Sequence, residues 1–551
     1  MAYMNGAPEH GCPLRPGCPS PTSTPEELER RAIIQRNDLL LHEAVIKNDT
    51  EAVRRILKEP LDINSRNNYG RAPIHWASSR GNLDIMEMLI SANCDIEARD
   101  KYGMRPLLMA CWHGHRPAVQ MLINTGACSN ATNKKHYTLL MCAARNNRVD
   151  VVDFLLDTLE DVKVDAVDIE GQTALFHAAM GGHTSIVRRL IEIGASAVKR
   201  NKESRTALHM ACERGHCEVA ELLLAHEIDM EAKDVNGNTP LHVAAQNQQT
   251  KLVQVLLDAA ADPDSENQKG STALHIACSL GSRGILDALL QHGAMLDKQN
   301  KSGNTPLHMA CQANEAETVE IVIQKGADLN CLNTRLQSPI HIAAEMGHTD
   351  ICKLLLAAGA DIEQREQCGR TPLYIAARGS FTAIVDMIIK TARLDYPAHE
   401  DKPSANGRKE SSGGGLTRKL SRKFRSGSKD EGRGHRDSER FREVLYKLAY
   451  KHLGHQEWKK LASHWAFTDD QIKAIEHQYN GPNSYKEHGF RMLLIWAHGL
   501  GPDVNPVKEL YESLVAIQKR PLADNLRRKI DQENEAIRKG NKTKCNHCVL
   551  S

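Results

Sequence analysis

The chain has 551 residues, too many for a single hydrophobic core, and its charges nearly cancel, with 71 Lys and Arg against 69 Asp and Glu. This balance gives no global field that would favour nucleic acid, so we expect no nucleic-acid partner and local recognition of any charged partner. No run of about 18 apolar residues is present that would span a membrane. Fifteen scattered cysteines without a secretory signal favour reduced thiols in the cytosol.

The N-terminal part of the chain divides into two segments. Residues 1–23 are rich in Pro, Gly and Ser and are expected to be disordered. Residues 24–36 are predicted to form a capping helix, because Thr24 can cap it, Pro25 suits its first turn and Glu27 completes a capping box.

From Asn37 to residue 396 the chain repeats itself. A hexapeptide recurs in forms such as TPLHVA, TALHIA, TPLHMA, SPIHIA and TPLYIA, and eleven copies begin at residues 39, 72, 105, 138, 173, 206, 239, 272, 305, 338 and 371. Each step is 33 residues except one of 35, where the segment LEDVKVD at 159–165 carries an insertion. A period of this length is typical of a solenoid.

The residues of each copy predict a pair of helices. Threonine is a helix N-cap and proline suits the first helical position. A second helix follows and ends at a Gly-Ala pair such as 293–294, where glycine accepts the left-handed conformation. A turn such as Asn236-Gly237 leads to the next copy, and stacking buries the apolar face of each unit. These features closely resemble the ankyrin repeat. The resemblance implies an all-α solenoid of about 11 helix-pair repeats with hairpin turns, whose concave face binds a protein client.

Histidine recurs at the fourth position of the hexapeptide, but the spacing argues against a metal site. The seven copies that keep it are His42, His75, His209, His242, His275, His308 and His341. Because they lie on successive layers, they cannot converge on one ion. The ankyrin resemblance implies that they bond the backbone of neighbouring repeats instead. The sequence also lacks a phosphate-binding loop, H-E-x-x-H and G-x-S-x-G. We therefore expect no catalytic residue, metal or cofactor, and no enzyme.

A second folded part follows a linker. Residues 397–436 are rich in Gly, Ser, Lys and Arg, which is typical of a flexible linker. Residues 437–520 are predicted to be helical, with apolar residues at helical spacing. The W-x-x-L-A sequence at 458–462 and the segment MLLIWA resemble a death domain. This implies a six-helix bundle that pairs with a death-domain protein through charged helix faces. The order of parts is similar to ankyrin repeat and death domain-containing proteins, which implies an adaptor in signal transduction.

Three aromatic residues stand out at repeat positions that are polar in most other copies. Tyr69 and Tyr102 lie three residues before the hexapeptide, and Trp112 lies seven residues after its first position. Grouped exposed aromatics predict a partner-binding hot spot. The alternative is ordinary packing against the helix at 24–36.

The linker contains a basic stretch with a candidate phosphorylation site. Residues 418–429 hold six Lys or Arg and no acid, and Ser421 follows the basic sequence RKL. Such a stretch can bind an anionic membrane surface, and phosphate on Ser421 would cancel part of its charge. The alternative is a solvated linker without a partner.

The tail at 521–551 is predicted to be helical and basic, and it ends in Cys-Val-Leu-Ser. Cys548 stands four residues from the C-terminus, as in the prenylation motif, and the final serine favours farnesyl. The motif resembles the tail of Ras-type GTPases. One lipid chain anchors weakly, so Cys545 is a candidate for acylation as a second signal. These features predict a cytoplasmic protein with reversible association with the cytosolic face of membranes. The alternative is an accidental motif.

A different kind of function follows from the ankyrin resemblance. Ankyrin domains are often hydroxylated on hairpin asparagines, and Asn64 and Asn330 lie in the favoured surroundings. The runner-up hypothesis is therefore a substrate or decoy for an asparaginyl hydroxylase.

Overall fold

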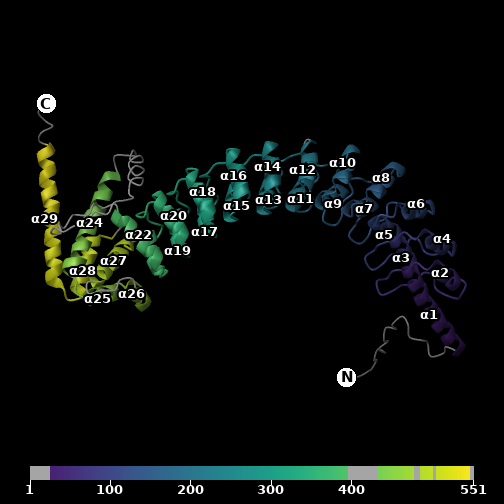
Figure 1. Cartoon of the computed structure of the whole chain (residues 1–551), viewed down its shortest axis with the longest axis horizontal. Coiled ribbons are helices and arrows are strands. Elements are labelled where there is room, and N and C mark those ends of the chain that lie inside the picture. The colour runs from purple at the N-terminus through teal and green to yellow at the C-terminus, as the bar shows by residue number, and fades with distance from the viewer. Residues whose placement is uncertain (1–24, 227, 395–430, 477–483, 501–503, 546–551) are drawn as a thin grey trace, which may run out of the picture. The chain divides into compact units, whose positions relative to one another are not determined.

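The computed structural model describes residues 25–226, 228–394, 431–476, 484–500 and 504–545. These residues form helices and turns without a strand, which confirms the all-α fold class. The helices belong to two compact units, one that ends at Val235 and one that begins at Asn236, and each is described by itself (Figure 1).

The first unit is a series of helix pairs. Its helices are α1 (Pro25–Lys47), α2 (Thr50–Ile56), α3 (Pro73–Arg80), α4 (Leu83–Ser91), α5 (Pro106–His113), α6 (Arg116–Asn124), α7 (Leu139–Arg145), α8 (Val149–Thr158), α9 (Ala174–Gly181), α10 (Thr184–Glu192), α11 (Ala207–Arg214) and α12 (Cys217–Leu224). The first helix of each pair packs on the first helix of the next, from α3 through α5, α7 and α9 to α11. The hexapeptides form these first helices, as their caps predict.

The N-terminal helix differs from the expected boundary at residue 36. Helix α1 continues without a break from Pro25 to Lys47 and so includes the first helix of the first repeat. No proline or glycine lies between Glu26 and Lys47, so nothing in the local sequence stops the helix. The expected cap residue Thr24 lies outside the described residues.

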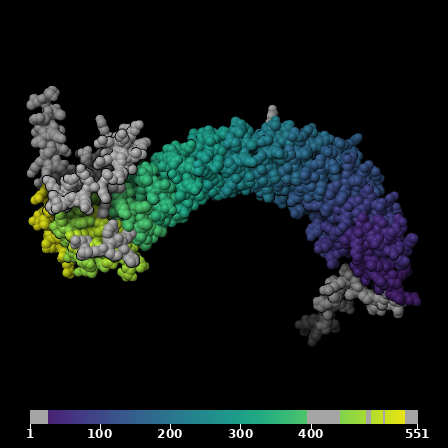
Figure 2. Space-filling view, in the orientation of Figure 1, coloured from purple at the N-terminus to yellow at the C-terminus, as the bar shows by residue number. Residues whose placement is uncertain are grey.

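The second unit combines further helix pairs with a helical bundle. The pairs are α13 (Pro240–Gln246) with α14 (Thr250–Asp258), α15 (Ala273–Ser279) with α16 (Arg283–Gln291), α17 (Pro306–Ala313) with α18 (Ala316–Gln324), α19 (Pro339–Met346) with α20 (Thr349–Ala358), and α21 (Pro372–Arg378) with α22 (Thr382–Leu394). The first and second helices form two adjacent rows (Figure 1). The space-filling view shows these repeats as one continuous surface (Figure 2).

The bundle of the second unit contains six helices in its described residues. They are α24 (Glu431–Lys451), α25 (Glu457–His464), α26 (Asp469–Glu476), α27 (Ser484–His498), α28 (Pro506–Ala516) and α29 (Arg520–Cys545). Helix α27 packs against α24, α25 and α26, and α28 packs against α25 and α29. Helix α27 is therefore the central element of the bundle.

The core of the bundle contains the residues that suggested it. Trp458 is 1% exposed, and Leu461 and Ala462 of the same W-x-x-L-A segment are fully buried. The ring of Trp465 stacks on that of Trp496 with a centroid distance of 4.2 Å. The apolar residues at helical spacing include Leu445, Leu448, Leu510 and Leu514, which are fully buried, and Ile517, which is only partly covered because it follows the last turn of α28.

Candidate protein-interaction surfaces

The hexapeptide histidines connect neighbouring repeats, as His308 shows. Its Nδ1 accepts a hydrogen bond from the backbone N–H of Thr305 at 3.1 Å. Its Nε2 must therefore carry the proton, and it donates to the carbonyl oxygen of Gln337 in the next repeat at 3.0 Å. The ring is fully buried, and burial lowers the pKa of His308, so the imidazole stays neutral.

The same pair of bonds recurs within each unit and confirms the expected structural role. The equivalent acceptors are Met104 for His75, Ser271 for His242, Asn304 for His275 and Arg370 for His341. His42 differs, because its Nε2 lies 3.1 Å from the carbonyl of Ser65 inside its own hairpin. His75, His242, His275 and His341 therefore use both ring nitrogens to hold the solenoid together, whereas the buried Nδ1 of His42 has no hydrogen-bond partner among the described residues.

Two tyrosines project from adjacent hairpins of the first unit. A turn residue holds the backbone of each tyrosine. Asn67 Oδ1 accepts from the N–H of Tyr69 at 2.9 Å, and Asp100 Oδ1 accepts from the N–H of Tyr102 at 2.8 Å. The side chains are 56% and 59% exposed. The guanidinium of Arg71 lies 5.9 Å from the centre of the Tyr69 ring. The exposed pair argues against burial under the N-terminal helix.

The third aromatic of the expected hot spot is placed differently. Trp112 is only partly exposed, and its ring stacks on that of Tyr137 with centroids 6.5 Å apart. Trp112 is therefore less exposed than the other two aromatics, because Tyr137 just before the next hexapeptide stacks on it.

Sequence reasoning missed two residues next to the tyrosines. The guanidinium of Arg71 also lies 5.0 Å from the ring centre of Trp76, while its Nε lies 3.2 Å from Asp100 Oδ2. We call Tyr69, Arg71, Trp76 and Tyr102 the aromatic patch. The sequence shows that Arg71 directly precedes the second hexapeptide, but its contacts with the aromatic rings depend on the fold of the hairpin.

Asn64 and Asn330 occupy equivalent places in their repeats. The Oδ1 of Asn64 accepts from the N–H of Asp95 at 2.8 Å, and that of Asn330 accepts from the N–H of Asp361 at 2.9 Å. Asp264 does the same for the N–H of Met295 at 3.0 Å. This position is therefore a connector between hairpins that an asparagine or an acid can fill, and Asn330 is exposed.

A cavity of about 510 Å³ lies beside the 35-residue step of the first unit. Leu139 and Leu155 form part of its apolar lining, while Glu160, Asp161 and Lys163 from the insertion contribute polar groups. The insertion therefore forms part of the wall of this hollow.

The bundle exposes charged side chains on its outer helices. Lys508 and Glu512 on α28 pair at 3.8 Å with 75% and 58% of their side chains exposed. Arg527 and Asp531 on α29 pair at 3.9 Å with 65% and 69% exposed. Exposed pairs of this kind contribute little to folding, so their charges remain available to a partner.

The described residues contain no metal-binding cluster, and several of their cysteines are buried. No group of three His, Cys, Asp or Glu side chains converges among them. Burial raises the pKa of Cys142 to about 12, and it also raises the pKa of Cys111 and Cys212, so these thiols are unreactive. None of the described helices is long and apolar enough to cross a membrane.

The candidate modification sites lie outside the described residues or at their C-terminal end. Ser421 and Cys548 lie outside the described residues. Cys545 is the last residue of α29, and its side chain is also outside the description. These three assignments stay predictions.

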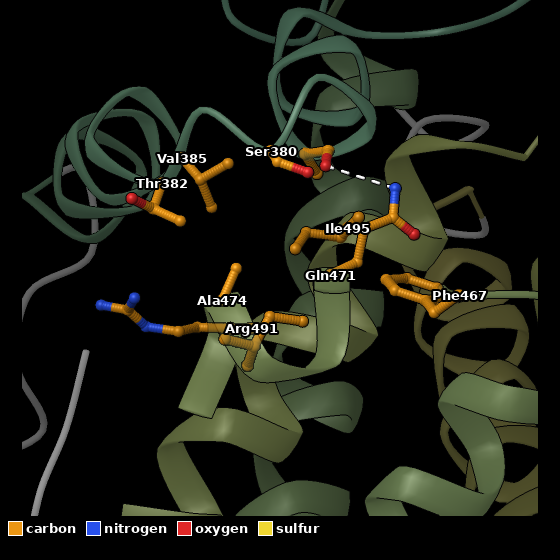
Figure 3. Close-up of a pocket in the computed structure, with 10 residues that line it drawn as sticks. Ser380, Thr382, Val385, Phe467, Gln471, Ala474, Arg491 and Ile495 are labelled. Atoms are coloured by element: carbon orange, nitrogen blue, oxygen red, sulfur yellow. Dashed lines mark hydrogen bonds between the residues drawn. The ribbon is translucent and has the colours of Figure 1, made fainter. Parts of the chain in front are cut away.

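The last repeat and the bundle meet within the second unit. A cavity of about 20 Å³ remains between them, lined by Val385 of α22 and by Ile475 and Ile495 of the bundle. Figure 3 shows the amide of Gln471 directed toward the repeat, where it donates to the carbonyl of Ala377 at 3.4 Å. The apolar lining and the small volume show that the two surfaces fit closely.

Comparison with known proteins agrees with both parts of the fold. The family model for ankyrin repeats (3 copies) matches residues 41–133, 89–168, 126–201, 193–267, 241–333 and 325–398. The model for the death domain matches residues 442–530. Among solved structures, the ankyrin repeat domain of Bcl-3, described as a unique member of the IkappaB protein family, is 29% identical, with a TM-score of 0.37. That match covers 40% of this chain and 99% of the Bcl-3 chain.

Proposed function

Because the chain belongs to the ankyrin-repeat family and also carries a death domain, we propose that it is a non-enzymatic adaptor in signal transduction. The observation that carries this proposal is the presence of two protein-interaction folds in one chain. An adaptor of this kind raises the effective concentration of one partner near another.

The aromatic patch is the proposed contact for the protein client of the repeats. Tyr69 and Tyr102 are exposed on adjacent hairpins, and grouped exposed aromatics are typical of residues that dominate binding energy. The nearby guanidinium of Arg71 adds a charge that is already held in place by Asp100. The patch therefore suits a partner that offers an apolar surface with acidic groups around it.

The bundle is proposed to pair with the death domain of another protein. The exposed charges of α28 and α29 support this role, because charge complementarity selects partners and fixes their register.

The tail is proposed to tether the adaptor to the cytosolic face of a membrane. In this proposal Cys548 carries a farnesyl group, Cys545 carries an acyl group, and the basic linker around Ser421 contacts anionic lipid. A single lipid chain binds only marginally, which is why a second signal is part of the proposal.

Proximity labelling from the full chain tests the adaptor role. The wild type is compared with a Tyr69→Ala, Tyr102→Ala double variant and with a Met295→Ala control, since Met295 is 61% exposed on a hairpin of the second unit. We expect a set of labelled proteins that the double variant loses and the control keeps. Equal labelling by all three proteins would refute the aromatic patch as the client site.

The second candidate function is that of a substrate or decoy for an asparaginyl hydroxylase. The equivalent placement of Asn64 and Asn330 supports it, and so does the exposure of Asn330. Mass analysis of the two peptides from oxygenated cells should then show the addition of one oxygen atom. Unmodified peptides would leave the asparagines with their connecting role alone.

A further inference from the structure

The last repeat lacks the histidine that normally bonds its cap. Its hexapeptide is TPLYIA, with Tyr374 in the histidine position and Thr371 as the cap. In the complete repeats the histidine Nδ1 lies close to the cap hydroxyl, for example 2.9 Å from Thr305 Oγ1. A tyrosine ring has no nitrogen for this contact, yet Thr371 is fully buried.

A histidine from the bundle occupies the missing place. His498 is the last residue of α27, and its Nδ1 lies 3.0 Å from Thr371 Oγ1. The backbone N–H of Thr371 donates to the carbonyl of His498 at 3.4 Å. The cap of the last repeat is therefore completed by an imidazole from 127 residues further along the chain.

A second bond of the repeat pattern also runs to the end of α27. In complete repeats a side chain reaches the carbonyl 33 residues later, as Arg200 does with Lys233 at 3.2 Å and Gln299 with Leu332 at 3.1 Å. The equivalent Arg365 donates instead to the carbonyl of Leu500. The segment after α27 thus provides an acceptor that another repeat would have provided.

Buried charges hold the two surfaces together. The Arg491 side chain of α27 is 2% exposed and pairs with Asp386 of α22. Its Nε also lies 3.3 Å from Glu487 Oε1, one turn earlier in α27. Arg442 of α24 pairs with Glu363 of the repeat hairpin. A buried guanidinium that loses a carboxylate is costly, so this contact depends on both sides being present.

We propose that the last ankyrin repeat is a docking site for the chain's own death domain, with the end of α27 standing in for a further repeat. This inference goes beyond the adaptor function, because its partner is a part of the same chain. Docking covers the side of α26 and α27 that carries Gln471 and Arg491, so a partner that needs this side must first displace the repeat.

Hydrogen exchange of the full chain tests the proposal. Asp386→Arg places a second cation against Arg491, and we expect exchange in α21 and α27 to rise at least tenfold. Lys353→Glu is the matched control, because it makes a charge change of equal size and opposite sign at the exposed position 33 residues earlier and should leave both helices unchanged. Asp386→Asn keeps the shape of the side chain and should give a smaller rise in the same two helices.

The outcomes separate the proposal from its alternatives. Unchanged exchange in α21 and α27 in folded Asp386→Arg and Asp386→Asn proteins would overturn it. Protection that depends on protein concentration would assign the docking to a second copy of the chain and would also overturn it. Neither measurement involves a client, so failure here does not affect the adaptor proposal.

Discussion

Replacement of His308 by leucine tests how the repeats are joined. The change removes the acceptor for the buried N–H of Thr305 and the donor to Gln337. The Gln337 carbonyl keeps a bond from the N–H of Asn333, so the Thr305 N–H is the group that loses its ring acceptor. Two lost bonds at about 1 kcal/mol each, with about 1 kcal/mol for the unsatisfied donor, lower the free energy of unfolding by roughly 3 kcal/mol at neutral pH. Leucine is of similar size, so a cavity adds little.

The same variant also tests how the free energy of unfolding depends on pH. Burial lowers the pKa of His308 below the ordinary value of 6.5. Below pH 6.5 the unfolded chain therefore binds a proton that the folded chain does not, and stability falls as the pH falls. The loss is about 1.4 kcal/mol per pH unit for one such group. The leucine variant has no such proton to bind. The difference in the free energy of unfolding between His308→Leu and the wild type should therefore shrink from about pH 7.5 to about pH 5.5.

Urea unfolding followed by far-UV circular dichroism at the two pH values measures both effects. His464→Leu serves as the control, because His464 is exposed on α25 and should change stability little at either pH. A deficit below about 1 kcal/mol at neutral pH would refute the connecting role. A deficit that grows on acidification would refute the neutral state of His308.

Three further predictions concern other parts of the chain. An alanine Cβ at Gly303 would lie 2.6 Å from a backbone nitrogen of the next hairpin, whereas one at Gly293 meets nothing within 4 Å, although both residues have positive φ. In urea unfolding Gly303→Ala should therefore cost about 1 kcal/mol more than Gly293→Ala, and equal costs would contradict the close approach. Tyr69→Ala and Tyr102→Ala should each weaken client binding about tenfold in a titration with the labelled client, with unchanged thermal stability. Cys548→Ser should move a fluorescent fusion from membranes to the cytosol, and an unchanged distribution would refute the tether.

The repeat architecture was predictable because its information is local. Each hexapeptide contains a cap, a first-turn residue and a buried apolar face within a few positions, so that Thr305 and Pro306 can be read without knowledge of the fold. The histidine bonds were also expected, because the spacing argued against a shared ion and the ankyrin resemblance implied bonds to the backbone of neighbouring repeats. The exposure of Tyr69 and Tyr102 followed from the same register, because the equivalent position is polar in most other copies.

Features that depend on contacts between distant residues were not predictable in this way. The partial burial of Trp112 requires Tyr137 of the next repeat, and the position of Arg71 against Trp76 requires the folded hairpin. The continuity of α1 into the first repeat was missed for a different reason. The motif register suggested a boundary, but helices end at stop signals, and none lies there.

The docking of the bundle on the last repeat could not be predicted from the sequence. The exchange of histidine for Tyr374 is visible in the sequence, but Leu108 and Met141 replace histidine in other repeats as well. A substitution at this position therefore does not by itself indicate a foreign partner. What distinguishes the last repeat is that no repeat follows it, so its cap and its buried acceptors must be satisfied by another element. Helix α27, which ends at His498, meets that requirement. The death domain therefore contributes to the stability of the solenoid and is also a binding module.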